Sequence, residues 1–173
     1  MNGQKGITLI ELLIVVAMAS LALLAIATYT LPWLAKEDLR GAVYDVQTYM
    51  QLARIEAVSR NRDCRFVIDT NTRRVAVLDA NGTISNLSDD ILLYETDLPD
   101  TVSFARPDSG SAVTLQNPSG TIFQTVFGDD GIVSSGTGIV AMLGGTSYTR
   151  IAVFGAGGIQ VQRWNGAAWT AGS

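Results

Sequence analysis

A run of apolar residues near the N-terminus limits what this 173-residue chain can fold into. The twenty residues from Leu12 to Leu31 carry no charge and no proline. As a helix rising about 1.5 Å per residue, they reach about 30 Å, the thickness of the hydrocarbon core of a bilayer. Lys5 precedes the run, which predicts a cytoplasmic N-terminus and places the rest of the chain on the outer side of a membrane. The run therefore predicts a transmembrane helix.

One acidic residue, Glu11, stands at the start of this run and is the only charge between Lys5 and Lys36. A charged side chain within a membrane span costs about 2.5–3.5 kcal/mol on insertion scales. A plain membrane anchor gives Glu11 no role. A secretory signal peptide matches the small residues Ala25 and Ala27 of a cleavage pattern, but it also has to accommodate the carboxylate. The residues around Glu11 offer a third interpretation.

The stretch "KGITLIE", residues 5–11, resembles the prepilin signature of type IV pilins and of the pseudopilins of type II secretion. In that family a dedicated peptidase cuts after the glycine of a short basic leader, and the new N-terminal residue is methylated. The resemblance implies cleavage between Gly6 and Ile7, N-methylation of Ile7, and the family glutamate at Glu11. Ile7 stands where phenylalanine is usual. The implied partners are the prepilin peptidase, other pilins or pseudopilins through the N-terminal helix, and the inner-membrane assembly platform.

The resemblance also suggests a physical role for Glu11. Cleavage after Gly6 creates a cationic amine at Ile7, and two opposite charges in a low dielectric offset their desolvation only when they lie close together. Within one helix, the amide groups of the first turn compete for the carboxylate. We therefore hypothesise that Glu11 pairs with the Ile7 amine of an adjacent subunit, so that assembly itself supplies the compensation.

A second helical pattern covers residues 37–60. Its apolar residues recur at steps of three and four: Leu39, Ala42, Val43, Val46, Tyr49, Met50, Ala53 and Ala57. The opposite face carries Asp45, Gln47, Gln51, Arg54 and Arg60. This pattern is typical of an amphipathic helix that packs against a sheet. Pro32 leaves two alternatives, two separate helices or the single long helix that is the spine of the pilin family.

Short strand patterns follow this helix. They cover residues 64–68, 75–78, 91–95, 101–105, 121–127, 138–143, 149–154 and 158–164. Glycine-containing turns separate the later strands at residues 128–131, 144–145 and 155–158. The order predicts an α+β fold, in which the long N-terminal helix has a transmembrane half and an amphipathic half, and the latter packs on a head of antiparallel sheet.

The stretch "LRGAVYDVQTYMQLARIEAVSRNRDCRFVI", residues 39–68, resembles the minor pseudopilin GspH and the related minor pilin FimT. Residues 51–57 ("QLARIEA") with Arg60 are similar to a segment of the family helix, with Ile55 in place of the more usual serine. The stretches "VFGDDGIVSSGTGIVAML" and "TRIAVFGAGGIQVQR" are similar to the later family strands. The resemblance implies three regions, a leader of residues 1–6, a transmembrane and filament-core helix of residues 7–35, and a periplasmic head of residues 36–173.

Composition argues against several functions. The chain has no histidine, which removes the commonest general base and metal ligand, and its lone Cys64 has no partner for an intramolecular disulfide. We predict neither an enzyme nor a cofactor. The acidic turns Asp79–Gly82 and Gly128–Gly131 lack the twelve-residue ligand loop of a calcium site, and we predict no metal. Residues 155–158 lack the spacing of a nucleotide loop and predict a hairpin turn.

Two basic regions raise the question of DNA. The first contains Arg54, Arg60, Arg62, Arg65, Arg73 and Arg74, but interspersed acids make a solvated, mixed-charge face the simpler interpretation. The second is the tail, where Arg163 lies beside Trp164 and near Trp169. Arginine and aromatic side chains bind single-stranded bases, and some FimT-like pilins bind DNA. Alternatively, these tryptophans cover a sheet edge or contact a partner subunit. The net charge of −4 disfavours a dedicated nucleic-acid binder.

The sequence thus favours a minor pseudopilin or minor pilin, a structural subunit cut by prepilin peptidase. We expect it to be a single-pass protein of the bacterial inner membrane with a periplasmic head, and later part of a type II secretion pseudopilus or a type IV pilus, within it or at its tip. The main alternative is a DNA-binding, FimT-like minor pilin used in DNA uptake. The third is a conventionally secreted protein whose mature N-terminus lies near Thr28.

Overall fold

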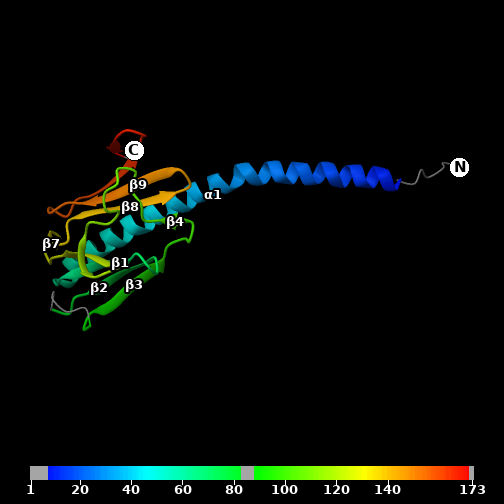
Figure 1. Ribbon diagram of the computed structural model, residues 1–173. Coiled ribbons are helices and arrows are strands. Elements are labelled where there is room, and N and C mark those ends of the chain that lie inside the picture. The colour runs from blue at the N-terminus through cyan, green and yellow to red at the C-terminus, as the bar shows by residue number, and fades with distance from the viewer. Residues whose placement is uncertain (1–7, 83–87, 172–173) are drawn as a thin grey trace. The chain divides into compact units, whose positions relative to one another are not determined.

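The protein is described by a computed structural model over residues 8–82 and 88–171 (Figure 1). Its helix, α1, spans Leu9–Arg60 and runs through Pro32, in agreement with the single-helix interpretation. The chain divides into two compact units, the first ending at Leu34 and the second starting at Ala35. We therefore describe α1 in two parts, a first part of residues 9–34 and a second part of residues 35–60. The side chains of residues 25 and 27–31 are not described.

Thr8 immediately precedes α1 and caps its first turn. The backbone N–H of Glu11 donates to Thr8 Oγ1 at 3.3 Å and to the Thr8 carbonyl oxygen at 3.1 Å. Threonine is a favoured residue here because its hydroxyl satisfies an amide that has no partner within the helix. Every apolar side chain described in this part is exposed, from Leu9 at 79% to Leu34 at 50%. Over the described residues, no helix is long and apolar enough to cross a membrane. The transmembrane role of residues 7–35 stays a prediction.

The second unit contains the strands, which form two antiparallel sheets. The first sheet has the order β3-β2-β1-β6-β5, with β7 also paired to β6. Its strands are β1 (Cys64–Asp69), β2 (Arg74–Asp79), β3 (Ile91–Asp97), β5 (Gln116–Ser119), β6 (Ile122–Phe127) and β7 (Val133–Ser135). The second sheet has the order β11-β10-β9-β8-β4. Its strands are β4 (Val102–Ser103), β8 (Gly138–Gly144), β9 (Ser147–Val153), β10 (Ile159–Trp164) and β11 (Trp169–Ala171).

Most of the predicted strands are confirmed, with three additions. The β1–β2 hairpin and the β9–β10 hairpin form as their turns predict, and α1 ends at Arg60. The strand predicted over residues 101–105 shrinks to Val102–Ser103, because only these two residues pair with β8. The sequence did not reveal β5, β7 or β11, whose short, polar or proline-containing segments have no alternating apolar pattern. The predicted antiparallel head is confirmed, and its strands form two sheets.

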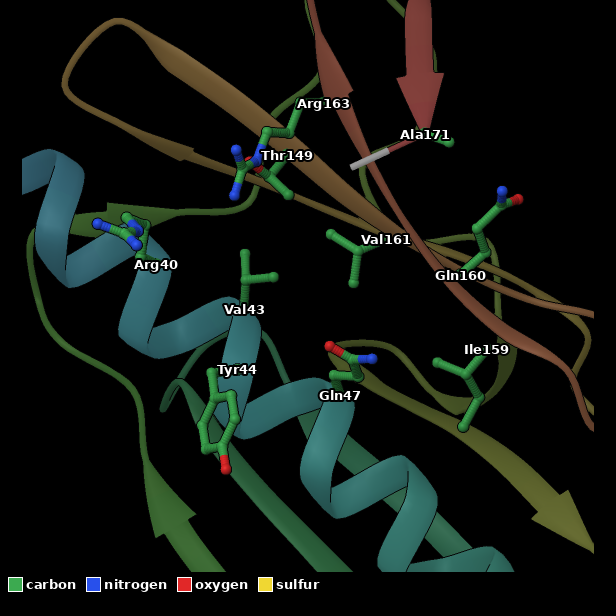
Figure 2. Close-up of a pocket in the computed structure, with 10 residues that line it drawn as sticks. All are labelled: Arg40, Val43, Tyr44, Gln47, Thr149, Ile159, Gln160, Val161, Arg163 and Ala171. Carbon is green, nitrogen blue, oxygen red and sulfur yellow. The ribbon is translucent and has the colours of Figure 1, made fainter. Parts of the chain in front are cut away.

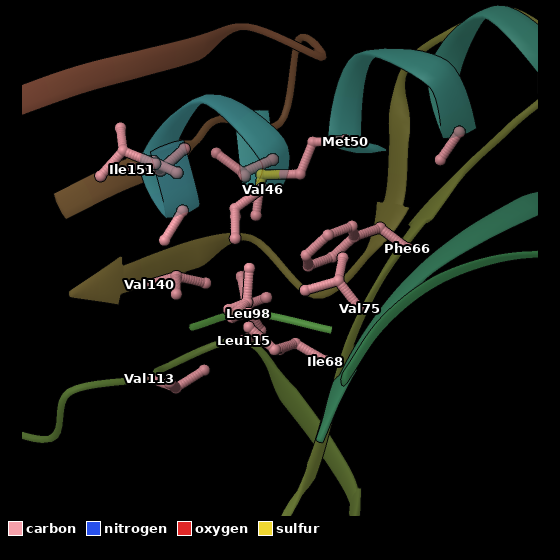
Figure 3. Close-up of a cluster of buried hydrophobic side chains, with 14 of the residues drawn as sticks. Val46, Met50, Phe66, Ile68, Val75, Leu98, Val113, Leu115, Val140 and Ile151 are labelled. Carbon is pink, nitrogen blue, oxygen red and sulfur yellow. The ribbon is translucent and has the colours of Figure 1, made fainter. Parts of the chain in front are cut away.

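The second part of α1 packs against both sheets. Figure 1 shows it with β8 and β9 on one side and β1, β2 and β3 on the other, and the core contains residues of all these elements except β3. The predicted apolar face of the helix is confirmed, since Ala42, Val46 and Met50 have no exposed area. Figure 3 shows Val46 and Met50 beside Phe66, Ile68, Val75, Val140 and Ile151 from the two sheets. Each such buried aliphatic or aromatic side chain stabilises the head by about 1.5–3 kcal/mol.

One glycine sets how closely the second sheet approaches the helix. A Cβ on Gly144, at the end of β8, would lie 2.5 Å from both the Ala35 carbonyl oxygen and Leu39 Cβ. Such distances are far below van der Waals contact, so only a residue without a side chain lets the strand lie against the backbone of α1 here. Gly144 thus helps to place the second part of α1 on the second sheet.

Candidate functional sites

The predicted processing and assembly site lies at the start of α1. Gly6 and Ile7, the predicted cleavage and methylation residues, lie outside the described residues. Glu11 is described, and its side chain is exposed in the first turn of α1. The amides of that turn carry the partial positive charge of the helix N-terminus, which stabilises a carboxylate by about 0.3–1 kcal/mol. Thr8 and Glu11 also have the spacing of a capping box. The helix itself therefore offsets part of the cost of Glu11, and its pairing with a neighbouring amine stays a prediction.

The three predicted DNA-contacting residues do not share a surface. Trp164 and Trp169 are opposite each other in the β10–β11 pair, with ring centroids 5.4 Å apart in an edge-to-face arrangement. The Arg150 guanidinium carbon lies 4.5 Å from the centre of the Trp169 ring. Arg163 occupies the next position along β10, and successive side chains of a strand point to opposite faces. It lines a groove beside α1 instead, together with Val43.

The two tryptophans are engaged within the head itself. Trp169 Nε1 lies 3.4 Å from Asp108 Oδ2, and Arg106 also donates to Asp108. The hydrogen bond from Arg106, followed by that from Trp169, lowers the pKa of Asp108 to about 2. The loop that contains Asp108 is thereby tied to the last hairpin. This arrangement agrees with the interpretation that the tail tryptophans cover part of a sheet.

The predicted basic face is a mixed-charge face, with one exception. Arg60 pairs with Glu56 at 2.6 Å, and Arg74 pairs with Asp97 at 2.9 Å, both at the surface. Arg65 was expected to be solvated as well, and this is wrong. Its side chain has no exposed area, and its Nε lies 2.6 Å from Asp90 Oδ2.

The burial of Arg65 follows from strand alternation. Its neighbours Cys64 and Phe66 point into the core, so Arg65 lies on the other face of β1, where Gln124 and Asp90 receive its guanidinium. Burial raises the pKa of Asp90, while Arg65 acts in the opposite direction. Removing one member of such a pair leaves a buried charge without compensation. Loss of either Arg65 or Asp90 alone is therefore expected to destabilise the head strongly. Nothing in the sequence marked it, because its partners come from distant segments.

The two acidic turns lie near each other in the head. A hollow between them is lined by Asn61, Arg62, Asp63, Asn81, Gly82 and Asp129. Burial raises the pKa of Asp63, and repulsion from Asp129 adds to this effect. Among the described residues, no group of three or more potential metal ligands is assembled. The turn at residues 155–158 is a hairpin, as predicted, in which the Phe154 N–H donates to the Gly158 carbonyl oxygen at 2.9 Å.

A groove that the sequence did not reveal lies between the second part of α1 and the second sheet. Its volume is about 460 Å³, in the range of ligand-binding clefts. It is lined by Arg40, Val43, Tyr44, Gln47, Thr149, Ile159, Gln160, Val161, Arg163 and Ala171 (Figure 2). The i, i+3, i+4, i+7 spacing of its helical residues can be read from the sequence. Their position opposite β9, β10 and β11 depends on the tertiary structure and could not be read from it.

Together, the N-terminal helix, the two antiparallel sheets and the prepilin-type motif define a protein of the pilin and pseudopilin class. The family described as type II transport protein GspH matches residues 42–158, more than half of the chain. The prokaryotic N-terminal methylation motif matches residues 1–27. The chain belongs to the GspH family of type II transport proteins and is a minor pseudopilin or minor pilin subunit. The members of this family are structural proteins of the pilin and pseudopilin type.

The solved structure of a minor pilin, FimU, shows the same fold. The type IV minor pilin FimU of Pseudomonas aeruginosa (strain PAO1) is 15% identical, with a TM-score of 0.52 over 78% of this chain and 94% of the FimU chain. The minor pseudopilin EpsH from the type 2 secretion system of Vibrio cholerae is 16% identical, with a TM-score of 0.48 over 69% of this chain and 94% of the EpsH chain. Comparison with curated proteins gives no significant match. DNA binding receives no specific support from these comparisons and stays a prediction.

Proposed function

We propose that the chain is cut between Gly6 and Ile7 by a prepilin peptidase, methylated at Ile7, and assembled into a periplasmic filament through α1. The supporting observation is the order of the two family matches along one helix. The methylation motif ends at residue 27 and the GspH match begins at residue 42, and α1 contains both positions. Before assembly, residues 7–35 hold the chain in the inner membrane and the head lies in the periplasm.

The exposed apolar side chains of the first part of α1 support this proposal. Leu13, Val16 and Leu24 are each more than half exposed in the isolated chain. Contiguous apolar surface of this kind marks a membrane or protein interaction site. Lipid covers these side chains in the membrane, and other N-terminal helices cover them in the filament. Glu11 then pairs with the Ile7 amine of an adjacent subunit, because a carboxylate removed from water needs a nearby opposite charge.

The proposal is tested by the mature N-terminus. Mass spectrometry of the chain extracted from membranes is expected to show Ile7 as the first residue, with the mass of one added methyl group. Gly6→Leu is expected to retain the leader and to abolish incorporation into filaments. A mature chain that begins near Thr28, or one that retains its first six residues while assembling normally, would refute the proposal.

A further inference from the structure

The groove between α1 and the second sheet has a distinctive charge. Ten residues line it, of which two are arginines and none is acidic. Figure 2 shows the Arg40 and Arg163 side chains at the same end of the groove. Concave surfaces lined by one sign of charge focus the electrostatic field and attract the opposite charge. An anionic group therefore fits this end of the groove.

The two arginines are available to such a group. Among the described residues, no carboxylate lies within ion-pair distance of the exposed Arg163. Arg40 contacts Glu37 at 3.1 Å, but both side chains are more than half exposed, and such pairs contribute little. An arginine binds a carboxylate through two parallel hydrogen bonds, which gives direction as well as strength. A partner carboxylate can therefore engage either arginine at little cost.

The remainder of the groove favours a peptide. Val161 and Ile159 of β10 form an apolar wall, and Val43 and the amide of Gln47 project toward it from α1 (Figure 2). Tyr44 stands at the side of the groove with 69% of its surface exposed. Tyrosine and arginine, together with tryptophan, are enriched among the residues that contribute most to binding at protein interfaces. The tryptophans that were predicted to stack on DNA bases, Trp164 and Trp169, do not line the groove; they lie on the other face of β10 and are engaged there.

We infer that this groove binds an acidic segment of a neighbouring filament subunit, with an aspartate or glutamate on Arg40 and Arg163 and an adjacent aliphatic side chain on the apolar wall. The inference rests on the proposed function, because it takes the partner from the filament. It adds a second contact, made by the head, to the contact made by the N-terminal helix. The two contacts differ in chemistry, since the groove combines charge and apolar surface and the first part of α1 is almost wholly apolar.

The test uses the full-length chain in cells that assemble the filament, with Gln47 replaced by the photoreactive residue p-benzoylphenylalanine. Irradiation is expected to link this position to a segment of another filament subunit that contains Asp or Glu next to an aliphatic residue. Arg163→Glu is expected to lower the cross-link yield about tenfold or more. Arg40→Glu is expected to lower the cross-link yield less, since Arg40 already pairs with Glu37. Replacing the partner's acidic residue with arginine is expected to restore the yield with Arg163→Glu.

Arg62→Glu is the matched control, because Arg62 is exposed, carries the same charge and lies outside the groove. It is expected to leave the yield unchanged. A link to lipid or nucleic acid, a yield that Arg163→Glu does not change, or no link in a chain recovered from filaments would overturn the inference and leave the proposed function standing. An unprocessed chain that never enters filaments would overturn both.

Discussion

The two parts of α1 are both rich in apolar residues but place them in different surroundings. In the second part, one face is buried, with Ala42, Val46 and Met50 fully covered by the two sheets of the head. In the first part, every described apolar side chain is exposed, including Ile14 at 55% and Leu21 at 69%. The buried apolar residues of the second part therefore stabilise the fold of the chain itself, whereas those of the first part are exposed, as the contacts with lipid or other chains that we propose for them require.

This difference teaches that one helix can satisfy two physical requirements. The second part follows the 3.6-residue period, because a helix on a sheet buries only one stripe. The first part has apolar residues around its whole circumference, as a helix surrounded by lipid or by other helices requires. Changes in the first part are thus expected to affect assembly and leave head stability unaltered, and changes in the buried core of the second unit are expected to lower head stability.

The largest expected effect concerns Glu11. Glu11→Ala is expected to leave membrane insertion intact and to reduce the chain recovered in sheared filaments at least about tenfold, because the Ile7 amine of the neighbour loses its partner. The melting temperature of the head is expected to stay the same. Glu95→Ala, which removes an exposed carboxylate of β3, is the control and is expected to assemble normally. Normal assembly of the Glu11 variant would contradict the assembly role that we propose for the first part of α1.

The next effect concerns the buried ion pair. Arg65→Met is expected to lower the free energy of unfolding of the head by about 3–5 kcal/mol, because Asp90 is left buried without its cation. The double variant Arg65→Met, Asp90→Leu is expected to recover most of this loss. Arg74→Met, which removes a half-exposed partner of Asp97, is expected to cost about 0–1 kcal/mol. Urea unfolding followed by tryptophan fluorescence measures all three, and equal losses for Arg65 and Arg74 would contradict the assignment.

A smaller effect concerns the approach of the second sheet to α1. Gly144→Ala is expected to lower the free energy of unfolding by about 1–3 kcal/mol, since the new Cβ would lie 2.5 Å from the Ala35 carbonyl oxygen and from Leu39 Cβ. Gly155→Ala is the control, because a Cβ there meets nothing within 4 Å. Equal stability of the two variants in thermal unfolding would show that this contact does not place the helix.

The smallest expected effect is a pH dependence at Asp63. Burial and Asp129 raise the pKa of Asp63 above its ordinary value of 3.8, so its ionised form opposes folding. This destabilisation is present above the raised pKa and disappears as the pH falls below 3.8, where the carboxyl is protonated in both states. Asp63→Asn is therefore expected to raise the melting temperature at pH 7 and to change it little at pH 3. A stabilisation that is equal at both pH values would rule out this origin.

Much of the fold could be predicted because its signals are local. The 3.6-residue pattern marked the end of α1 and the apolar face of its second part, and turn residues marked the β1–β2 and β9–β10 hairpins. By contrast, β11 has no pattern of its own and forms because Trp169 lies opposite Trp164 on the neighbouring strand. The division of the strands between two sheets could not be predicted, since it depends on which strands pair across long separations in the chain.

The sequence by itself determined the class of the protein, because the motif at residues 5–11 and the apolar run that follows are contiguous and can be read without a structure. Only the tertiary structure decided the surroundings of the arginines. Arg65 is buried because Asp90 and Gln124 receive it, and Arg163 faces α1 while its neighbour Trp164 faces away. The physical reason is that distant segments of the chain together determine the burial and electrostatic environment of a side chain. A processing motif, in contrast, lies within one continuous segment.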